Sequence, residues 1–301
     1  DTATRALKPG EAGRLVIDHA ARIFTQARDL TRDLEELAGL QAPEMHFGTD
    51  LFAAELPLGA ALGRMAAANS RLRVHAETSD FEHLAREVLA GKLEFAVGDT
   101  AGAERHPTRL AIEPVAEHRM FFFVRQGHPL VAAREHSLET ILVFPLVSPR
   151  LPQRMAVHLG KDAAHARVDR ETGDLTPSLM VDSFAVARNA VMAGDAVGLA
   201  PLVALEQDLR TREISLLPFT APWLQLSYGL FYTRKRPLSR VAQLFMTQLR
   251  QVEVVLQARE QRALARLDGK KRTRRTATKR KTRPAAEPAA RVAKSTTAPA
   301  R

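Results

Sequence analysis

Short apolar segments alternate with helical segments along the body of this 301-residue chain, and that alternation constrains its fold more than any other feature. The pattern predicts strands at 45–48, 72–76 and 93–97, and helices at 51–68 and 80–90. Asp50 and Asp80 stand at the expected N-caps, and Gly91 follows the second helix as a stop signal. Strands joined by helices of this length form βαβ units and a parallel sheet.

A second set of elements follows from residue 120 onward. Strands are predicted at 120–124, 179–181, 197–200 and 226–232, with a short helix end and a strand within 141–147. A helix is predicted at 184–192, with Asp182 as its cap, and another at 239–256. Pro201 is predicted to open a further helix between them. Residues 150–176 have no clear period. The repeated pattern predicts an α/β fold with two lobes.

A long helix is predicted before this body, between the breakers Pro9-Gly10 and Gly39. Its apolar residues follow the alternating spacing of four and three that is typical of a coiled-coil seam. The seam residues are Val16, Ala20, Ile23, Ala27, Leu30, Leu34 and Leu37. We expect residues 11–40 to form a dimerisation helix. The alternative is an amphipathic helix that lies on its own body.

The positive charge of the chain is concentrated at its C-terminal end. Residues 258–301 carry 15 Lys and Arg against 3 Asp and Glu, whereas residues 1–257 carry 29 against 31. The composition of 258–301 predicts a disordered tail that binds nucleic-acid phosphates without reading sequence. The residues expected to do so are Lys270, Lys271, Arg272, Arg274, Arg275, Lys279, Arg280 and Lys281. A solubilising extension without a specific role is the alternative.

Five segments are similar, in order and spacing, to those of LysR-type transcriptional regulators. They are 11–23 (EAGRLVIDHAARI), 45–49 (MHFGT), 89–97 (LAGKLEFAV), 124–130 (VRQGHPL), and 181–184 (VDSF) with 191–201 (VMAGDAVGLAP). The chain resembles such a regulator without its N-terminal winged helix-turn-helix. It departs from the family at Pro9-Gly10, where a Leu-Thr pair is usual, at Ala196, where Gly is common, and in its basic tail.

The resemblance implies a two-lobed effector domain like a type-2 periplasmic binding protein, preceded by a linker helix. The implied divisions are a wing remnant at 1–10, the linker helix at 11–40, the effector domain at 41–257 and the tail at 258–301. The implied lobes are 44–117 with 237–257, and 118–236. The family also implies a small-molecule effector, DNA as a partner, and a homodimer that often pairs into a tetramer.

A small effector is expected in the cleft between the lobes, beyond the carboxyl ends of the strands. The residues expected there are Thr49, Asp50, Leu51, Thr78, Ser79, Ser148, Ser183 and Gly198. Hydroxyl groups beside helix starts suit a carboxylate ligand. A carboxylate at Asp50 would instead repel an anion and suit an amine or a hydroxyl. Each of these residues taken alone is as readily a simple cap or turn residue.

Several classes of protein are disfavoured by the sequence. The chain has no cysteine, which excludes disulfide scaffolds and thiolate chemistry. Phosphate-binding glycine loops, nucleophile elbows and zinc-binding helix motifs are absent, so we expect no catalytic residues, no metal and no cofactor. No segment is apolar enough to span a membrane, and the chain as written begins without an export signal. A cytoplasmic protein is therefore expected.

The function predicted from these observations is a ligand-responsive, DNA-binding transcriptional regulator. Effector binding would change the closure of the lobes and so the geometry of the dimer. A solute-binding protein of a transport system shares the two-lobed architecture and is one alternative. A dimeric ligand-sensing fragment that does not bind an operator is another.

Overall fold

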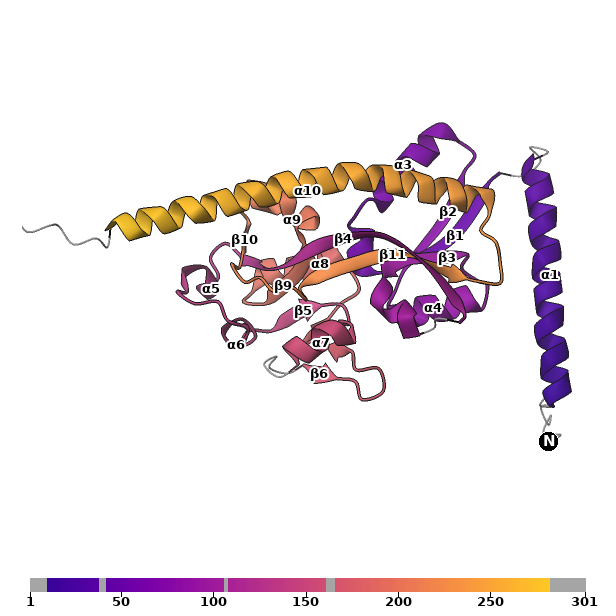
Figure 1. Ribbon diagram of the computed structural model, residues 1–301, viewed down its shortest axis with the longest axis horizontal. Helices are drawn as coiled ribbons and strands as arrows, with labels where there is room; N and C mark the ends of the chain where they lie inside the picture. Colours follow the sequence, from indigo (N-terminus) through magenta and orange to yellow (C-terminus); the bar gives the residue numbers. More distant parts are fainter. Residues whose placement is uncertain (1–9, 38–41, 106–107, 161–165, 282–301) are drawn as a thin grey trace, which may run out of the picture. The chain divides into compact units, whose positions relative to one another are not determined.

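The structure is a computed structural model that describes residues 10–37, 42–105, 108–160 and 166–281. The body folds around a nine-stranded sheet that passes through β4 (Figure 1). Residues up to 258 belong to one compact unit, and residues 259–301 belong to a second. The predicted alternation of strands and helices is confirmed, and each half of the sheet forms one lobe.

The first lobe contains parallel strands that follow the predicted βαβ pattern. They are β1 (Glu44–Thr49), β2 (Arg73–Thr78) and β3 (Phe95–Asp99), in the order β2-β1-β3. Helix α4 (Phe81–Leu89) connects β2 to β3, and the 3-10 helix η1 (Thr100–Arg105) follows β3. The core contains the stacked rings of Phe47 and Phe95, and the ring of Phe245 lies 5.1 Å from that of Phe47.

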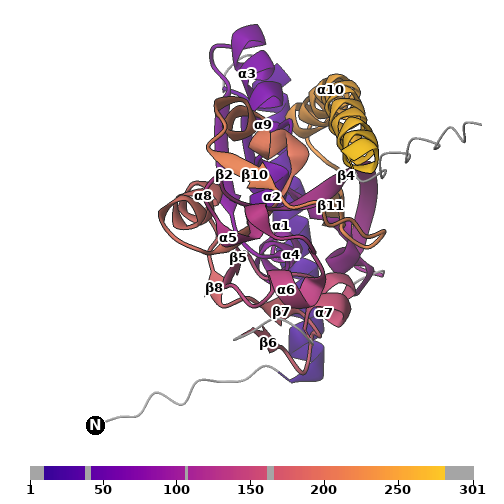
Figure 2. The ribbon, with the colours of Figure 1, turned by 90° about the vertical axis from the view of Figure 1, so that its left-hand side faces the viewer.

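The second lobe is built around β9, which pairs with β4 and β5. Helices α8 and α9 pack against β4 and β9, and both helices are labelled in Figure 2. Its strands are β5 (Leu146–Ser148), β6 (Arg167–Val168), β7 (Leu175–Thr176), β8 (Leu179–Met180), β9 (Val197–Pro201) and β10 (Ile214–Leu216). Its helices are α5 (Pro129–Ala132), α6 (Leu138–Ile141), α7 (Gln153–Leu159), α8 (Phe184–Ala193) and α9 (Leu202–Thr211).

Two strands join the lobes. β4 (Leu110–Arg125) pairs with β11 (Gln225–Thr233) along its first part and with β9 and β10 along its last part. β11 also pairs with β3, so it belongs to the sheet of the first lobe. The boundary drawn from the sequence placed residues 225–233 in the second lobe. The structure differs because strand pairing, which sequence periodicity does not report, assigns β11 to β3.

A buried polar cluster holds the C-terminal helix α10 against both crossing strands. The Tyr228 hydroxyl of β11 donates a hydrogen bond of 2.5 Å to Oε2 of Glu253 in α10. Nε2 of His118 in β4 lies 3.1 Å from Oε1 of the same carboxylate. All three side chains are buried, and burial together with the Glu253 carboxylate raises the pKa of the Tyr228 phenol.

Two details of the predicted helices are wrong. The helix predicted at 51–68 is two helices, α2 (Leu51–Ala54) and α3 (Leu58–Ala68), because Pro57 lacks an N–H and disfavours helix in the residue before it. The N-cap of α8 is Ser183 rather than Asp182, since the Ser183 hydroxyl accepts from the amide of Val186 at 3.5 Å.

The C-terminal helix is longer than the sequence predicts. α10 (Arg240–Lys281) continues past residue 256, where the apolar period ends, and covers much of the segment expected to be disordered. Ala, Arg, Lys, Gln and Leu dominate this extension, and all are strong helix formers, which accounts for a helix without an apolar period. The side chains of the eight basic residues named above, and all of 282–301, lie outside the described part.

The predicted N-terminal helix is confirmed as α1 (Glu11–Leu37). Four of its seam residues are 57% to 66% exposed in the single chain: Val16, Ile23, Leu30 and Leu34. An apolar stripe of this kind is stabilised when another helix covers it. The side chain of Leu37 and the wing remnant at 1–9 lie outside the described residues.

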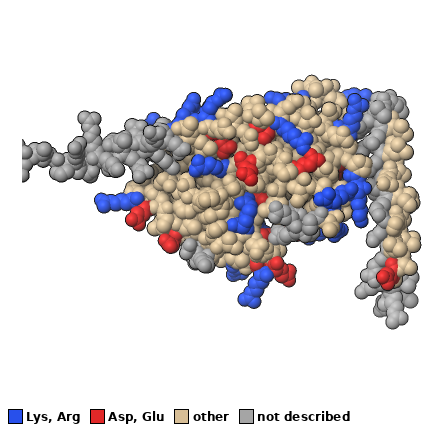
Figure 3. Space-filling model, in the orientation of Figure 1, with Lys and Arg blue, Asp and Glu red and all other residues tan. Residues whose placement is uncertain are grey.

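The charges on the body are mixed in sign. Figure 3 shows basic and acidic side chains interspersed over the visible face of the described residues. This agrees with the near-neutral charge balance of residues 1–257.

Candidate functional site

A pocket of about 70 Å³ lies where the carboxyl ends of strands from both lobes meet. Its lining includes residues at or within two positions of the carboxyl ends of β1, β2 and β3 in the first lobe and β5 and β8 in the second. They are Asp50, Leu51, Phe52, Ser79, Asp80, Phe81, Glu82, Asp99, Gly102, Pro149, Arg150, Pro152, Asp174 and Asp182. This is the edge at which open α/β sheets bind ligands.

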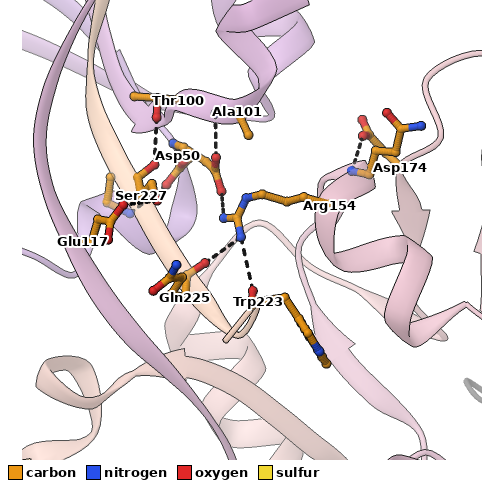
Figure 4. A network of polar contacts seen from close by, with 12 residues as sticks. Asp50, Thr100, Ala101, Glu117, Arg154, Asp174, Trp223, Gln225 and Ser227 are labelled. Carbon is orange, nitrogen blue, oxygen red and sulfur yellow. Dashed lines mark hydrogen bonds and ion pairs between the residues drawn. The ribbon is translucent and has the colours of Figure 1, made fainter. Parts of the chain in front are cut away.

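Asp50 belongs to the first-lobe wall of the pocket. Its Oδ1 accepts from the amide of Ala53 at 2.7 Å and caps α2, as the sequence predicts. Its Oδ2 accepts from the amide of Asp99 at 2.5 Å, so one carboxylate ties the ends of β1 and β3 together (Figure 4). Burial raises the pKa of Asp50 to about 6, because desolvation disfavours the charged form.

Two other carboxylates at the pocket also bind helix starts. Oδ1 of Asp80 accepts from the amide of His83 at 2.9 Å and caps α4. Oδ1 of Asp174, a buried residue, accepts from the amide of Gln153 at 3.0 Å, where α7 begins. At each of the starts of α2, α4 and α7, one backbone amide therefore already donates to a carboxylate of the chain itself.

Arg154 of α7 joins the two lobes beside this pocket. Its guanidinium binds the Asp99 carboxylate at the end of β3 and donates to the carbonyl of Gln225 at 2.7 Å (Figure 4). A second pocket of about 300 Å³ adjoins Arg154 and shares Gly102, Pro152 and Asp174 with the first. The interlobe surface is thus held by a charged contact beside the two pockets.

Three of the predicted effector residues line the first pocket: Asp50, Leu51 and Ser79. Thr49 and Ser148 are buried, and their hydroxyls donate to the carbonyls of Asp50 and Pro149. These hydroxyls act as local turn groups.

The remaining predicted effector residues lie elsewhere. Thr78 is exposed at the end of β2 and pairs in register with Thr49. Ser183 caps α8 next to Asp182, which does line the pocket. Gly198 is buried in β9, and a Cβ there would lie 2.3 Å from the ring of Phe123. Gly198 therefore makes room for that ring and does not line either pocket.

Sequence reasoning missed several lining residues. Asp99 could have been predicted from the sequence, since it follows a predicted strand as Asp50 does. Arg150, Arg154 and Asp174 were not, because they fall in the weakly patterned stretch 150–176 and α7 is only seven residues long. Within the described ranges, no group of three or more His, Cys, Asp or Glu side chains could hold a metal ion. The same ranges contain no helix suited to crossing a membrane.

Comparison with known proteins agrees with this geometry. The profile of the LysR substrate binding domain matches residues 38–253. The chain is 28% identical over 236 residues to an SDS degradation transcriptional activation protein of Pseudomonas sp., covering 77% of this chain and 74% of that protein. It is 26% identical to the HTH-type transcriptional regulator GalR of Pseudomonas putida, covering 83% of this chain and 61% of GalR.

Solved structures share the fold. A full-length OxyR from Pseudomonas aeruginosa matches with a TM-score of 0.57 at 14% identity, covering 83% of this chain and 79% of OxyR. The regulatory domain of MetR from N. meningitidis matches with a TM-score of 0.55 at 14% identity, covering 71% of this chain and 95% of that domain. The matched profile and the shared fold define a two-lobed domain of the LysR substrate-binding class. The chain belongs to the LysR family of transcriptional regulators.

Proposed function

We propose that the pocket between the lobes is the effector site of this ligand-responsive regulator. The observation that carries the proposal is the pocket itself, which is lined from both lobes at the carboxyl ends of their strands. A ligand there contacts both lobes at once and changes the free energy of closing them. A coupling of about 1–3 kcal/mol would change operator occupancy several-fold.

The proposal is tested by a substitution that fills the pocket with a larger side chain. Ser79→Phe places a ring in the lining, and Ser70→Phe places the same ring at an exposed site outside both pockets. We expect the transcriptome of cells with the Ser79→Phe protein to lose effector-dependent regulation, while Ser70→Phe cells respond as wild type. A Ser79→Phe protein with a normal response would overturn the assignment of the pocket.

Dimerisation through α1 belongs to the same proposal. The exposed seam of α1 supports a homodimer, and the family often pairs such dimers into tetramers. Re-angling of paired DNA-binding heads by the lobes would then alter the bound promoter. A cytoplasmic location and the lack of an enzymatic role are also proposed, on the basis of membership in a family of transcription regulators.

The basic C-terminal region is proposed to add sequence-independent affinity for DNA. The excess of Lys and Arg in 258–301 supports this, because each neutralised phosphate releases counterions. The test compares the whole chain with a chain ending at residue 257 on random duplex DNA over a salt series. We expect the shortened chain to bind more weakly and with a shallower dependence on salt. Equal affinities and equal slopes would overturn this role.

A further inference from the structure

The helix starts at the interlobe pocket are unsuited to an anionic ligand. Backbone N–H groups at helix starts commonly bind ligand phosphates and carboxylates. Here Asp50, Asp80 and Asp174 already accept hydrogen bonds from the starts of α2, α4 and α7. An anion entering the pocket meets carboxylates at the places where it needs donors.

The charged lining of the pocket is mainly negative. Six of the described lining residues carry carboxylates, and Arg150 is the one lining residue among them with a guanidinium. Arg154 lines the neighbouring pocket, and its guanidinium is held by Asp99 and by backbone carbonyls. Asp182 is exposed at the second-lobe side of the pocket, where a ligand reaches it without breaking a capping bond.

Apolar groups supply the rest of the wall. Leu51, Phe52 and Phe81 come from the first lobe, and Pro149 and Pro152 come from the second. A ligand that fits both kinds of surface has a small apolar body and a polar head that donates hydrogen bonds. Desolvated carboxylates favour a positively charged head, because it compensates the cost of their burial.

We infer that the effector of this pocket is a cationic amine with a small apolar body, bound by the carboxylates of Asp50 and Asp182. The inference rests on the proposed function of the pocket and narrows its ligand class. The ammonium head donates to the two carboxylates, and the apolar body lies against the Phe and Pro side chains. Binding from both lobes favours their closure around the ligand.

The test uses three probes of equal chain length: n-butylammonium, butan-1-ol and butanoate. Each is titrated into the whole chain by isothermal titration calorimetry at neutral pH. We expect n-butylammonium to bind at least tenfold more tightly than either other probe. Asp182→Asn is expected to weaken its binding at least threefold, and so is Asp50→Asn, which keeps an N-cap side chain for α2. Glu135→Gln makes the same charge change at an exposed site outside the pocket and is expected to leave binding unchanged.

The outcomes distinguish an error in the proposed ligand class from an error in the proposed effector site. Butanoate or butan-1-ol binding as tightly as the ammonium, with loss of that binding in Ser79→Phe, overturns the amine class and leaves the effector pocket in place. Ammonium binding that survives Asp182→Asn and Asp50→Asn also overturns the amine assignment. Absence of binding by all three probes, or binding that persists in Ser79→Phe, overturns the pocket and the class together.

Discussion

The guanidinium of Arg154 in α7 binds the carboxylate of Asp99 at the end of β3, and this contact joins the second lobe to the first. The same guanidinium donates to the carbonyl of Gln225 at the start of β11. One side chain therefore connects a helix of one lobe, a strand end of the other and a strand that crosses between them. Its contribution to stability is measurable.

We expect a double-mutant cycle with Arg154→Gln and Asp99→Asn to give a coupling energy of about 1–2 kcal/mol in urea unfolding, because both side chains are largely buried. The control cycle uses Arg125→Gln and Asp195→Asn, a more exposed pair at 2.7 Å, for which we expect about 0.5 kcal/mol. Equal coupling energies in the two cycles would show that the interlobe contact is no stronger than a surface ion pair.

Asp50 gives stability a specific dependence on pH. Its pKa rises from 3.8 to about 6 on folding, so the folded state binds the proton more tightly. The stability contributed by the protonated form is present below pH 4 and is lost as pH rises through 6, a change of about 3 kcal/mol. Asp50→Asn stays neutral and lacks this change. Urea unfolding of both proteins from pH 4.5 to 7.5 measures the difference between them, and a constant difference would contradict the prediction.

The buried hydroxyl of Tyr228 is expected to contribute more to folding stability than the partly exposed hydroxyl of Tyr232. Tyr228→Phe leaves the buried carboxylate of Glu253 without a 2.5 Å hydrogen bond, and we expect a loss of about 1–3 kcal/mol. Tyr232→Phe removes a 2.6 Å bond to Glu113 in a partly exposed place, where water replaces the hydroxyl, so we expect less than about 1 kcal/mol. Thermal unfolding of the two variants compares them. A larger loss in Tyr232→Phe would be the contrary result.

Gly198 provides a test of packing. Gly198→Ala puts a Cβ against the ring of Phe123, and we expect a loss of about 1–3 kcal/mol. Gly63 lies in α3 with open space around it, so Gly63→Ala is expected to gain about 0.5–1 kcal/mol. Chemical denaturation gives both values. A Gly198→Ala protein as stable as wild type would show that the Phe123 ring moves without cost.

The role of the α1 seam in dimerisation is tested by placing a Lys either in the seam or outside it. Ile23→Lys places a charge in the seam, and we expect the chain to sediment as a monomer at concentrations where wild type is a dimer. Gln26→Lys adds the same charge at an exposed site outside the a and d positions and is expected to remain dimeric. Dimers of Ile23→Lys as stable as wild type would exclude this helix as the interface.

The sequence predicts features that local chemistry determines. Asp50 and Asp80 precede apolar helical runs, and both cap helices as expected. The break at Pro57 is not predicted, because apolar residues continue on both sides of it and favour one helix over 51–68. The extension of α10 was missed because its residues favour helix without forming an apolar stripe.

The candidate site could be predicted only in part, because some of its residues are positioned by contacts with distant parts of the chain and not by local pattern. Leu51 and Ser79 lie next to predicted strand ends, and the structure places both in the pocket. Arg154 and Asp174 come from a stretch with no period, and their positions depend on contacts with distant residues such as Asp99 and Gln153. Gly198 was expected in the cleft, and the structure shows it packed against Phe123.

The pairing of β11 with β3 also sets an order for biosynthesis. On the ribosome, the sheet of the first lobe must wait for β11, since residue 99 pairs with residue 228. The sheet of the second lobe needs no strand beyond residue 216 and can close while β11 is still inside the ribosomal exit tunnel. The half-made first lobe then exposes the edges of β3 and of the first part of β4, which is a hazard for aggregation. A released chain that ends near residue 220 is therefore expected to need chaperones more than one that ends past residue 258.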